Sequence, residues 1–306
     1  MNLKKTISTI ILLFIISGCS LLNKGGPTAT ISSTQIHTGT QGLETNFLKN
    51  SPPDAVFEDE EFPVYVQVAN NGAADIQNGY IAIGFQQDYF QSSLKNYNFN
   101  IRGKSLGNPA GEQQFFRFLI SAKEIIGDTR TIPITVSSCY SYNTIATVSV
   151  CIDTDVYNVK AVQKACSIQD INLKGGQGGP ITVTKIEPKM VTNEGNDVVI
   201  PQFTIDVENV EKGTVLKTSN VRDLCSASVL TKDTLNTVEI SVSLAEQKLT
   251  CNKDVLKLEN NKDSIVCQLE SGIDKTQPAY STLLQIKLDY GYSDSITKST
   301  TINKKA

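Results

Sequence analysis

The feature that most constrains the fold is a series of short segments in which apolar and polar residues alternate. The clearest examples are Phe62–Ala69, Gln114–Ile120, Phe203–Asn209 and Val238–Leu244. Such alternation places successive side chains on opposite faces of a strand that has one buried face. No stretch of a dozen residues has the periodicity of an amphipathic helix. The chain is therefore predicted to be all-β.

Further segments of this kind lie on either side of a glycine-rich stretch, Gly175–Pro180. Before it come Tyr80–Phe85, Ile132–Val136 and Ile145–Cys151, the last two joined by Tyr140–Thr144; after it come Ile181–Ile186, Gly213–Leu216, Ser264–Leu269, Leu283–Tyr290 and Ser295–Thr297. Short strands separated by turn residues are typical of sandwich folds. We expect two tandem immunoglobulin-like β-sandwich domains, residues 41–157 and 181–303. The linker between them, residues 158–180, is expected to include a short helical turn around Val159–Lys164.

The first residues have the pattern of an export signal. Lys4 and Lys5 form a basic start, an apolar run extends from Ile7 to Ile16, and Ser17 and Gly18 lead directly into Cys19. The run is about half of the ~20 apolar residues that span a bilayer. This arrangement resembles a lipoprotein signal peptide with its lipobox. The resemblance implies that residues 1–18 are removed and that Cys19 carries the lipid. An accidental cysteine in an uncleaved anchor remains the alternative.

A lipidated Cys19 implies that the chain works outside the cytoplasm, at the cell surface or the periplasmic face. Two or three acyl chains hold a protein on a bilayer effectively permanently, so the membrane is an expected partner. Residues 19–40 are predicted to form a flexible tether with a span of about 25 Å. Loss of Lys4 and Lys5 changes the side-chain charge from −3 to about −5. That charge gives no electrostatic basis for binding nucleic acid.

Six cysteines remain when Cys19 is set aside: Cys139, Cys151, Cys166, Cys225, Cys251 and Cys267. An even number in an exported chain indicates disulfides, and the lack of Cys-x-x-Cys pairs argues against zinc. Three cysteines lie on each side of the glycine-rich stretch, so either one bridge crosses it or one cysteine on each side stays free. The pairing that we favour closes two short loops, Cys151–Cys166 and Cys251–Cys267, and leaves Cys139–Cys225 to connect the domains.

Composition also argues against several classes of function. The chain has one histidine, His37, and no tryptophan. A single histidine excludes most histidine-based metal sites and argues against a histidine general base, and His37 is interpreted as a solvated tether residue. The lack of tryptophan weakens a sugar-binding interpretation, although ten tyrosines are present. No cofactor, metal or catalytic residue is predicted.

Two kinds of cluster invite a functional interpretation. The segment Glu58–Glu61 and the pair Asp153 and Asp155 are acidic, but neither has EF-hand spacing, so solvated turns are favoured over calcium sites. Tyr140 with Tyr142, and Tyr290 with Tyr292, share one face of an extended chain. We interpret them as core tyrosines with hydrogen-bonded hydroxyls, and stacking on a sugar or a protein partner is the alternative.

One strand pattern occurs twice. Val64–Gly72 and Phe203–Gly213 each alternate along a strand, reach an asparagine and close with a glycine. This pattern resembles the CARDB-type and related immunoglobulin-like modules of bacterial and archaeal surface proteins. The resemblance implies an extracellular sandwich used for spacing or adhesion, and it provides no catalytic residues.

These observations together favour a non-enzymatic, lipid-anchored protein of the cell envelope with a structural, spacing or adhesive role. The alternative is a partner- or ligand-binding lipoprotein, one subunit of a secretion or envelope assembly, in which an edge strand accepts a partner strand. A hydrolase that uses Asp and Glu residues of the acidic clusters is a third hypothesis.

Overall fold

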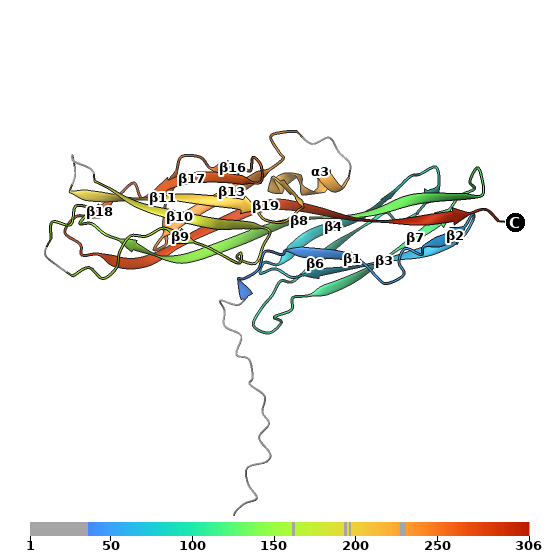
Figure 1. Ribbon diagram of the computed structural model, residues 1–306, viewed down its shortest axis with the longest axis horizontal. Helices are drawn as coiled ribbons and strands as arrows, with labels where there is room; N and C mark the ends of the chain where they lie inside the picture. Colours follow the sequence, from blue (N-terminus) through green and yellow to red (C-terminus); the bar gives the residue numbers. More distant parts are fainter. Residues whose placement is uncertain (1–35, 161–162, 193–194, 196, 227–230, 306) are drawn as a thin grey trace, which may run out of the picture. The chain divides into compact units, whose positions relative to one another are not determined.

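The computed structural model describes residues 36–305, except 161–162, 193–194, 196 and 227–230. The described chain consists mainly of antiparallel strands, so the all-β prediction is confirmed (Figure 1). A 3-10 helix, η1 (Thr218–Asn220), and a short helix, α3 (Val221–Cys225), lie between strands β12 and β13. Among the described residues, the helices are too short or too polar to span a bilayer.

The strands form three sheets. The first has the order β1 (Leu43–Phe47), β3 (Glu61–Asn70), β7 (Gln113–Ala122), β5 (Phe90–Gln91). The second has the order β15 (Thr250–Cys251), β17 (Lys262–Gln268), β11 (Val198–Asn209), β10 (Ile181–Thr192), β9 (Ile171–Asn172), and β18 (Ile273–Asp274) pairs with β11.

The third and largest sheet connects the other two. Its order is β14 (Gln247–Lys248), β13 (Thr237–Leu244), β19 (Tyr280–Asn303), β8 (Thr129–Ile152), β4 (Ile76–Phe85), β6 (Asn96–Ile101). Three short strands join it at the sides: β12 (Thr214–Leu216) and β2 (Ala55–Phe57) pair with β19, and β16 (Val255–Lys257) pairs with β13. Of these pairings, β2 with β19 is parallel.

Strands β8 and β19 run through the whole of this sheet. They pair without a break from Thr129 opposite Asn303 to Ile152 opposite Tyr280, over 24 residues of each strand. At ~3.3 Å per residue this ladder is about 80 Å long. The sequence predicted a connection at Tyr140–Thr144, but that segment is the middle of β8. The even-numbered residues of β8 continue to face the interior through it, so the period-two pattern never requires a turn.

The structure differs from the predicted two separate tandem domains, because β8 and β19 each run through both parts of the fold. The described residues form one compact unit. We call half A the part that packs β1–β7 against residues 129–139 of β8 and 293–303 of β19. Half B is the part that packs β9–β18 against residues 142–152 of β8 and 280–290 of β19. Because the last strand of the chain returns to half A, a boundary at residues 158–180 does not divide the sheets.

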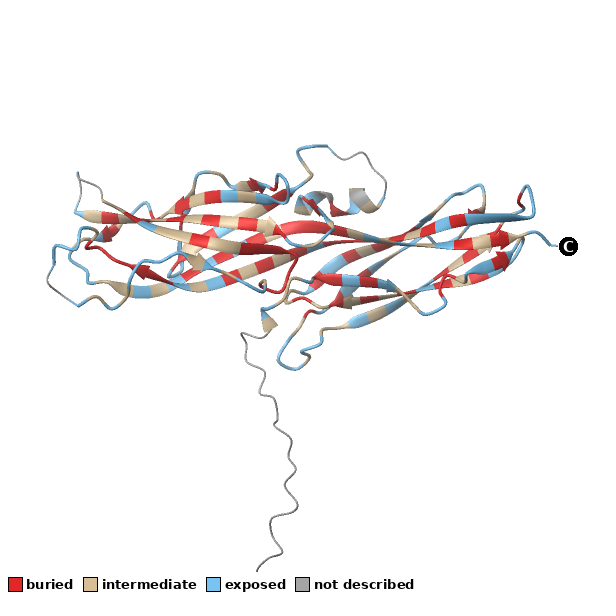
Figure 2. Cartoon of the chain, in the orientation of Figure 1, coloured by how far each residue is buried: buried red, intermediate tan, exposed pale blue. Residues whose placement is uncertain are grey.

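The interior of both halves is filled by the inward-facing residues, every second residue along each strand (Figure 2). In β3, Val64, Val66 and Val68 are fully buried, and in β11 Phe203 and Ile205 are fully buried. These residues belong to one continuous apolar cluster that also contains the inward-facing residues of β8 and β19. Burial of apolar side chains on one face of each strand explains why the alternating segments were the reliable signal in the sequence.

The glycine-rich stretch, predicted to belong to a linker between two domains, is packed into the fold. Residues 177–180 are buried, and β9 pairs with β10 just before them. Gly178 has φ +80°, and a Cβ atom there would lie 2.5 Å from the Cβ of Ala73. Glycine is therefore required by both conformation and close packing. The last tether residues join this segment, because Gly39 N–H donates to Gly175 O at 2.8 Å and Gly178 N–H donates to Gly39 O at 2.7 Å.

Three disulfides are present, and they are the three pairs favoured from the sequence: Cys139–Cys225, Cys151–Cys166 and Cys251–Cys267. The first joins residues 86 positions apart and attaches α3 to β8. The second closes the loop after β8, and the third joins β15 to β17. The helical turn predicted around Val159–Lys164 falls partly outside the described residues.

Candidate functional site

Four tyrosines occupy the place where the two halves meet, which we call the joint. Tyr140 and Tyr142 come from β8, and Tyr290 and Tyr292 come from β19 directly opposite them. Their ring centroids are 5.7–6.4 Å apart in tilted or edge-to-face pairs. All four side chains are buried, so they cannot stack on a sugar. The interpretation of these residues as core tyrosines is confirmed.

The hydroxyl groups of the four tyrosines hold the loops around the joint. The Leu43 N–H donates to the Tyr140 hydroxyl at 3.1 Å, and the Ala74 N–H donates to the Tyr142 hydroxyl at 3.1 Å. The Gly213 N–H donates to the Tyr292 hydroxyl at 2.9 Å. These three bonds reach three different connections of the chain. The fourth hydroxyl, that of Tyr290, lies 2.8 Å from Thr144 Oγ1. The joint is therefore a packed and hydrogen-bonded core rather than a hinge.

Burial raises the pKa of the Tyr140 and Tyr290 phenols well above the usual value of 10.0. It also raises the pKa of Tyr142 and Tyr292, although the N–H donors of Ala74 and Gly213 act in the opposite direction. Desolvation disfavours the charged phenolate in each case. The four groups stay neutral through the physiological pH range, which argues against a tyrosinate nucleophile at the joint.

These raised pKa values predict how stability depends on pH. An unfolded tyrosine ionises near pH 10, whereas the four joint tyrosines keep their protons in the folded chain. Their contribution to stability is therefore fully present below about pH 10 and falls as the pH rises above it. Spectrophotometric titration of tyrosinate should show at least four of the ten tyrosines ionising only when the strand signal in circular dichroism is lost. Titration of all ten in the folded state would contradict this expectation.

A polar cleft opens beside the joint. Its volume is about 560 Å³, and its lining includes His37, Asp75, Asn143, Gln177 and Asp289. The sequence suggested that His37 is a solvated tether residue; it is exposed, and it stands on the wall of this cleft, which we call the joint cleft. No local sequence pattern indicated the cleft, because its lining comes from segments far apart along the chain.

The joint cleft is acidic. Asp75 and Asp289 line it, and its lining contains no lysine or arginine. Gly103 N–H donates to Asp75 Oδ1 at 2.9 Å, and Lys287 Nζ lies 2.9 Å from Asp289 Oδ1. Within the described residues, no group of three or more His, Cys, Asp or Glu side chains is arranged to hold a metal ion. The chemistry of this cleft suits the binding of a cationic or hydrogen-bonding group.

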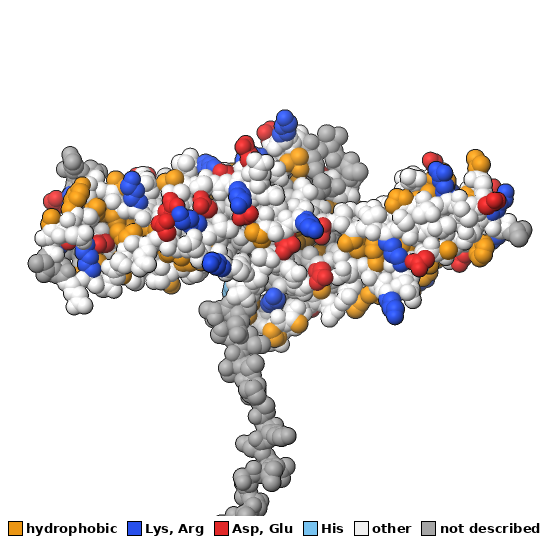
Figure 3. Space-filling model, in the orientation of Figure 1, with side chains coloured by type: hydrophobic (Ala, Val, Ile, Leu, Met, Phe, Trp, Pro, Cys, Tyr) orange, Lys and Arg blue, Asp and Glu red, His pale blue; other side chains and the backbone are white. Residues whose placement is uncertain are grey.

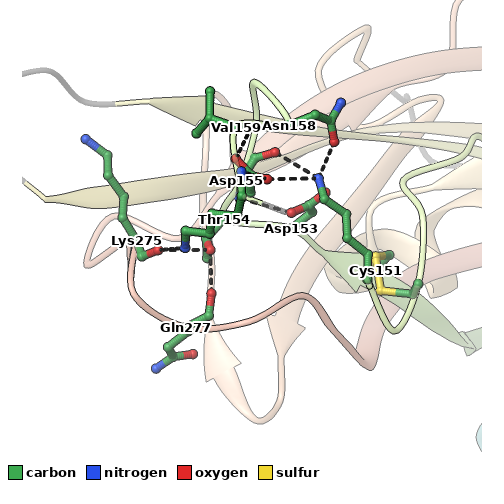
Figure 4. Close-up of polar contacts among 11 residues, drawn as sticks. Cys151, Asp153, Thr154, Asp155, Asn158, Val159, Lys275 and Gln277 are labelled. Carbon is green, nitrogen blue, oxygen red and sulfur yellow. Dashed lines mark hydrogen bonds and ion pairs between the residues drawn. A yellow bond between two sulfur atoms is a disulfide. The ribbon is translucent and has the colours of Figure 1, made fainter. Parts of the chain in front are cut away.

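The acidic pair after β8 is not the solvated turn that the sequence suggested. Asp153 and Asp155 are buried, and Lys164 Nζ lies 2.6 Å from Asp153 Oδ2 and 3.7 Å from Asp155 Oδ2 (Figure 4). Backbone N–H groups of Val159 and Lys160 donate to the Asp155 carboxylate at 2.9 and 3.1 Å. The lysine occupies the position that a calcium ion would need, so this cluster is a structural clamp for the loop.

The clamp also affects ionisation. Desolvation acts to raise the pKa of Asp155, but the two N–H donors and the nearby lysines outweigh it and hold the pKa below its usual value.

The cluster Glu58–Glu61 is largely exposed, as the sequence suggested, and Glu60 Oε2 accepts from Phe57 N–H at 2.7 Å. Neither cluster contributes a carboxylate to the lining of the joint cleft.

The strand β8 has an open edge in half B. Strand β4 pairs with residues 134–139 of β8 and then leaves it, whereas β19 continues on the other side to residue 152. Among the described residues, Asn143–Cys151, which we call the open edge, therefore pair with β19 alone. Asn143 and Ile145 also line the joint cleft, so the cleft lies where the open edge begins. Sequence patterns alone do not show this feature, because strand order is not encoded in local periodicity.

Figure 3 shows Lys and Arg interspersed with Asp and Glu over the face that it presents. Cys19, the predicted lipid attachment site, lies outside the described residues.

Comparison with known proteins finds no family model and no curated protein that matches the sequence. Solved structures show weak similarity. The sporulation control protein Spo0M of Bacillus subtilis is 13% identical with a TM-score of 0.20, over 55% of this chain and 80% of that one. The CupB6 tip adhesin of Pseudomonas aeruginosa is 11% identical with a TM-score of 0.19, over 87% of this chain and 98% of that one. The secreted serine protease VesC of Vibrio cholerae is 11% identical with a TM-score of 0.19, over 84% of this chain and 51% of that one. These scores are too low to support an argument about function.

Proposed function

We propose that this protein is a lipid-anchored, non-enzymatic component of the cell envelope that acts as a rigid spacer outside the cytoplasm. The observation that carries the proposal is the continuous ladder of β8 and β19, which passes through both halves without a break. The tyrosine joint and the Cys139–Cys225 disulfide hold the loops of both halves against that ladder. A body built in this way transmits position and force instead of bending between two domains.

Two independent features support the proposed location. Three disulfides are typical of a chain that folds in an oxidising compartment, such as the periplasm or the cell surface. The lipobox pattern before Cys19 supports attachment to a membrane. From Cys19 the chain has 18 steps to His37, which allow a reach of at most about 60 Å and an average span of about 23 Å. The tether joins the folded part at the joint, where Gly39 is bonded, and not at the free end of either half.

The anchor is tested by replacing Cys19. The variant Cys19→Ala is expected to keep its signal peptide or to be released, and in either case to lose fatty acylation completely. Intact-mass spectrometry of the protein purified from its own host should show a wild-type chain that begins at Cys19 and carries acyl chains. The matched control is Ser20→Ala, which should leave the lipid in place. A wild-type chain without acyl mass, or one that begins elsewhere, would refute the anchor.

The open edge favours a second candidate function, a partner-binding subunit of an envelope assembly. An exposed sheet edge presents unpaired backbone N–H and C=O groups that can bind another strand. Copurification of one stoichiometric partner with the full chain would support this function over a purely structural one. A monodisperse monomer without any captured protein would support the spacer alone.

A further inference from the structure

Every second residue of the open edge directs its backbone N–H and C=O groups away from β19. Among the described residues, no backbone hydrogen bond joins Asn143–Cys151 to anything other than β19. In half A the equivalent side of β8 is covered by β4, which pairs with residues 134–139. An uncovered edge of this length is a template for an added strand.

The open edge also lacks the features that usually protect such edges. Its sequence, Asn143-Thr-Ile-Ala-Thr-Val-Ser-Val-Cys151, has no charged residue and no proline, and it is rich in β-branched residues. Edges that are not meant to pair commonly carry lysine, proline or a bulge. The comparable stretch of β19 in half A, residues 294–300, carries Asp294 and Lys298. Lys298 Nζ reaches over to Pro52 O at 2.8 Å and to Asp54 Oδ1 at 3.1 Å.

The side chains of the open edge suit an added strand with alternating residues. Thr147 and Ser149 are exposed on the outer face, whereas Val148 is half-buried at the margin of the core. A neighbouring strand would cover Val148 on the inner side and meet the small hydroxyl side chains on the outer side. Cross-strand pairs between β-branched residues are favourable in this geometry.

The charge of the joint cleft defines one end of the partner. Asp75 and Asp289 line the cleft, and Asn143 and Ile145 of the open edge line it as well. A strand that occupies the open edge would therefore end at an acidic cleft. A basic side chain at that end would be attracted mainly to Asp75, because Lys287 already pairs with Asp289, and an acidic side chain would be repelled.

A second copy of this chain fits less well. Antiparallel pairing of two open edges about Thr147 would place Cys151 of one copy opposite Asn143 of the other. The residues that follow directly, Ile152–Asp155, include no lysine or arginine, and Lys164 already balances the charge of Asp153, so a second copy brings no basic side chain to the joint cleft. The lack of a basic side chain at this place favours a different protein as the occupant.

We propose that the open edge of β8 binds an extended, uncharged segment of a partner protein as an added strand, and that the joint cleft binds a basic side chain at one end of that segment. This inference deepens the second candidate function, and it does not require the lipid on Cys19. Backbone hydrogen bonds provide the attraction along the edge, and Asp75 and Asp289 provide the specificity at its end.

The test uses the full chain in detergent and synthetic peptides of alternating threonine and valine, capped at both ends, with an arginine at either the first or the last position. The matched peptides carry glutamine or glutamate instead of arginine. Hydrogen exchange followed by mass spectrometry should show protection of residues 143–151 by an arginine peptide. Residues 294–300 of β19 serve as the internal control and should exchange as before. Protection that is missing from residues 143–151, or equal on both stretches, would overturn the proposal.

Charge recognition is tested by substitution in the cleft. Asp289→Asn and Asp75→Asn should each weaken binding of the arginine peptide about two- to fivefold and leave binding of the glutamine peptide unchanged. Asp197→Asn, an exposed aspartate far along the chain from the cleft residues, is the control and should change neither. Thr147→Lys places a charge on the open edge and should weaken both peptides. Equal binding of the arginine and glutamate peptides would refute the basic end of the partner. These measurements test peptide binding at the open edge, and the Cys19→Ala variant tests the lipid anchor. The outcome of one experiment therefore does not determine the outcome of the other.

Discussion

Replacing Tyr290 with alanine is expected to lower the free energy of unfolding by about 3–5 kcal/mol, the range for truncating a large buried aromatic side chain. Tyr290 is fully buried and contacts Tyr142 and Tyr292 across the joint. Its removal leaves a cavity between the two halves and deprives Thr144 of its hydroxyl partner. Urea unfolding followed by circular dichroism measures the change. The wild-type chain should unfold in one transition, because both halves share β8 and β19.

Two further variants separate the contributions of the ring and the hydroxyl. Tyr290→Phe keeps the ring and should cost about 1–2 kcal/mol, because Thr144 and the N–H of Ile181 lose a partner. Tyr157→Ala is the control, since this side chain is 73% exposed, and should change stability by less than about 0.5 kcal/mol. Two separate transitions in the wild-type chain, or equal stabilities of Tyr290→Ala and Tyr157→Ala, would show that the joint does not couple the halves.

The second large effect is expected from removing the long-range disulfide. The double variant Cys139→Ala with Cys225→Ala releases a loop defined by a sequence separation of 86. The chain-entropy model assigns about 4–5 kcal/mol to a closed loop of this length. The same bridge attaches α3 to β8 and so links a connection of half B to the ladder. Urea unfolding under oxidising conditions measures the loss.

The matched control removes a short-range disulfide. Cys151→Ala with Cys166→Ala opens a loop with a sequence separation of 15, for which the same model gives about 3 kcal/mol. The Lys164 clamp, which stays in place, limits the additional freedom of that loop. The long-range variant should therefore be the less stable of the two. A smaller loss for the long-range variant would mean that Cys139–Cys225 does not restrict the unfolded chain as expected.

Several features of this molecule were accessible from local sequence. Alternation identified the central parts of β3, β7, β11 and β13, because a strand with one buried face must show that pattern. The paired tyrosines two residues apart were recognised as core residues for the same reason. The cysteine count, together with the short loops, favoured the three disulfides that the structure contains.

Other features were not accessible. Residues 158–180 were predicted to separate two domains, and the tyrosines near the centre of β8 were predicted to form a connection. Glycine and serine near a pair of tyrosines occur both in loops and at a tightly packed joint. Local composition therefore does not distinguish a loop from such a joint. The Asp153–Lys164 ion pair was missed, since it joins residues 11 positions apart through a folded loop. The joint cleft was missed because His37, Asp75 and Asp289 meet only after folding.

The division between these two groups has one physical cause. Burial of a strand face acts through neighbouring residues, so the order of amino acids alone specified the strands and the pool of cysteines. Which strands lie side by side depends on the free energy of the whole packed chain, and that free energy favoured two 24-residue strands shared by both halves over two self-contained sandwiches. The joint, its cleft and the uncovered stretch of β8 exist only as consequences of that pairing.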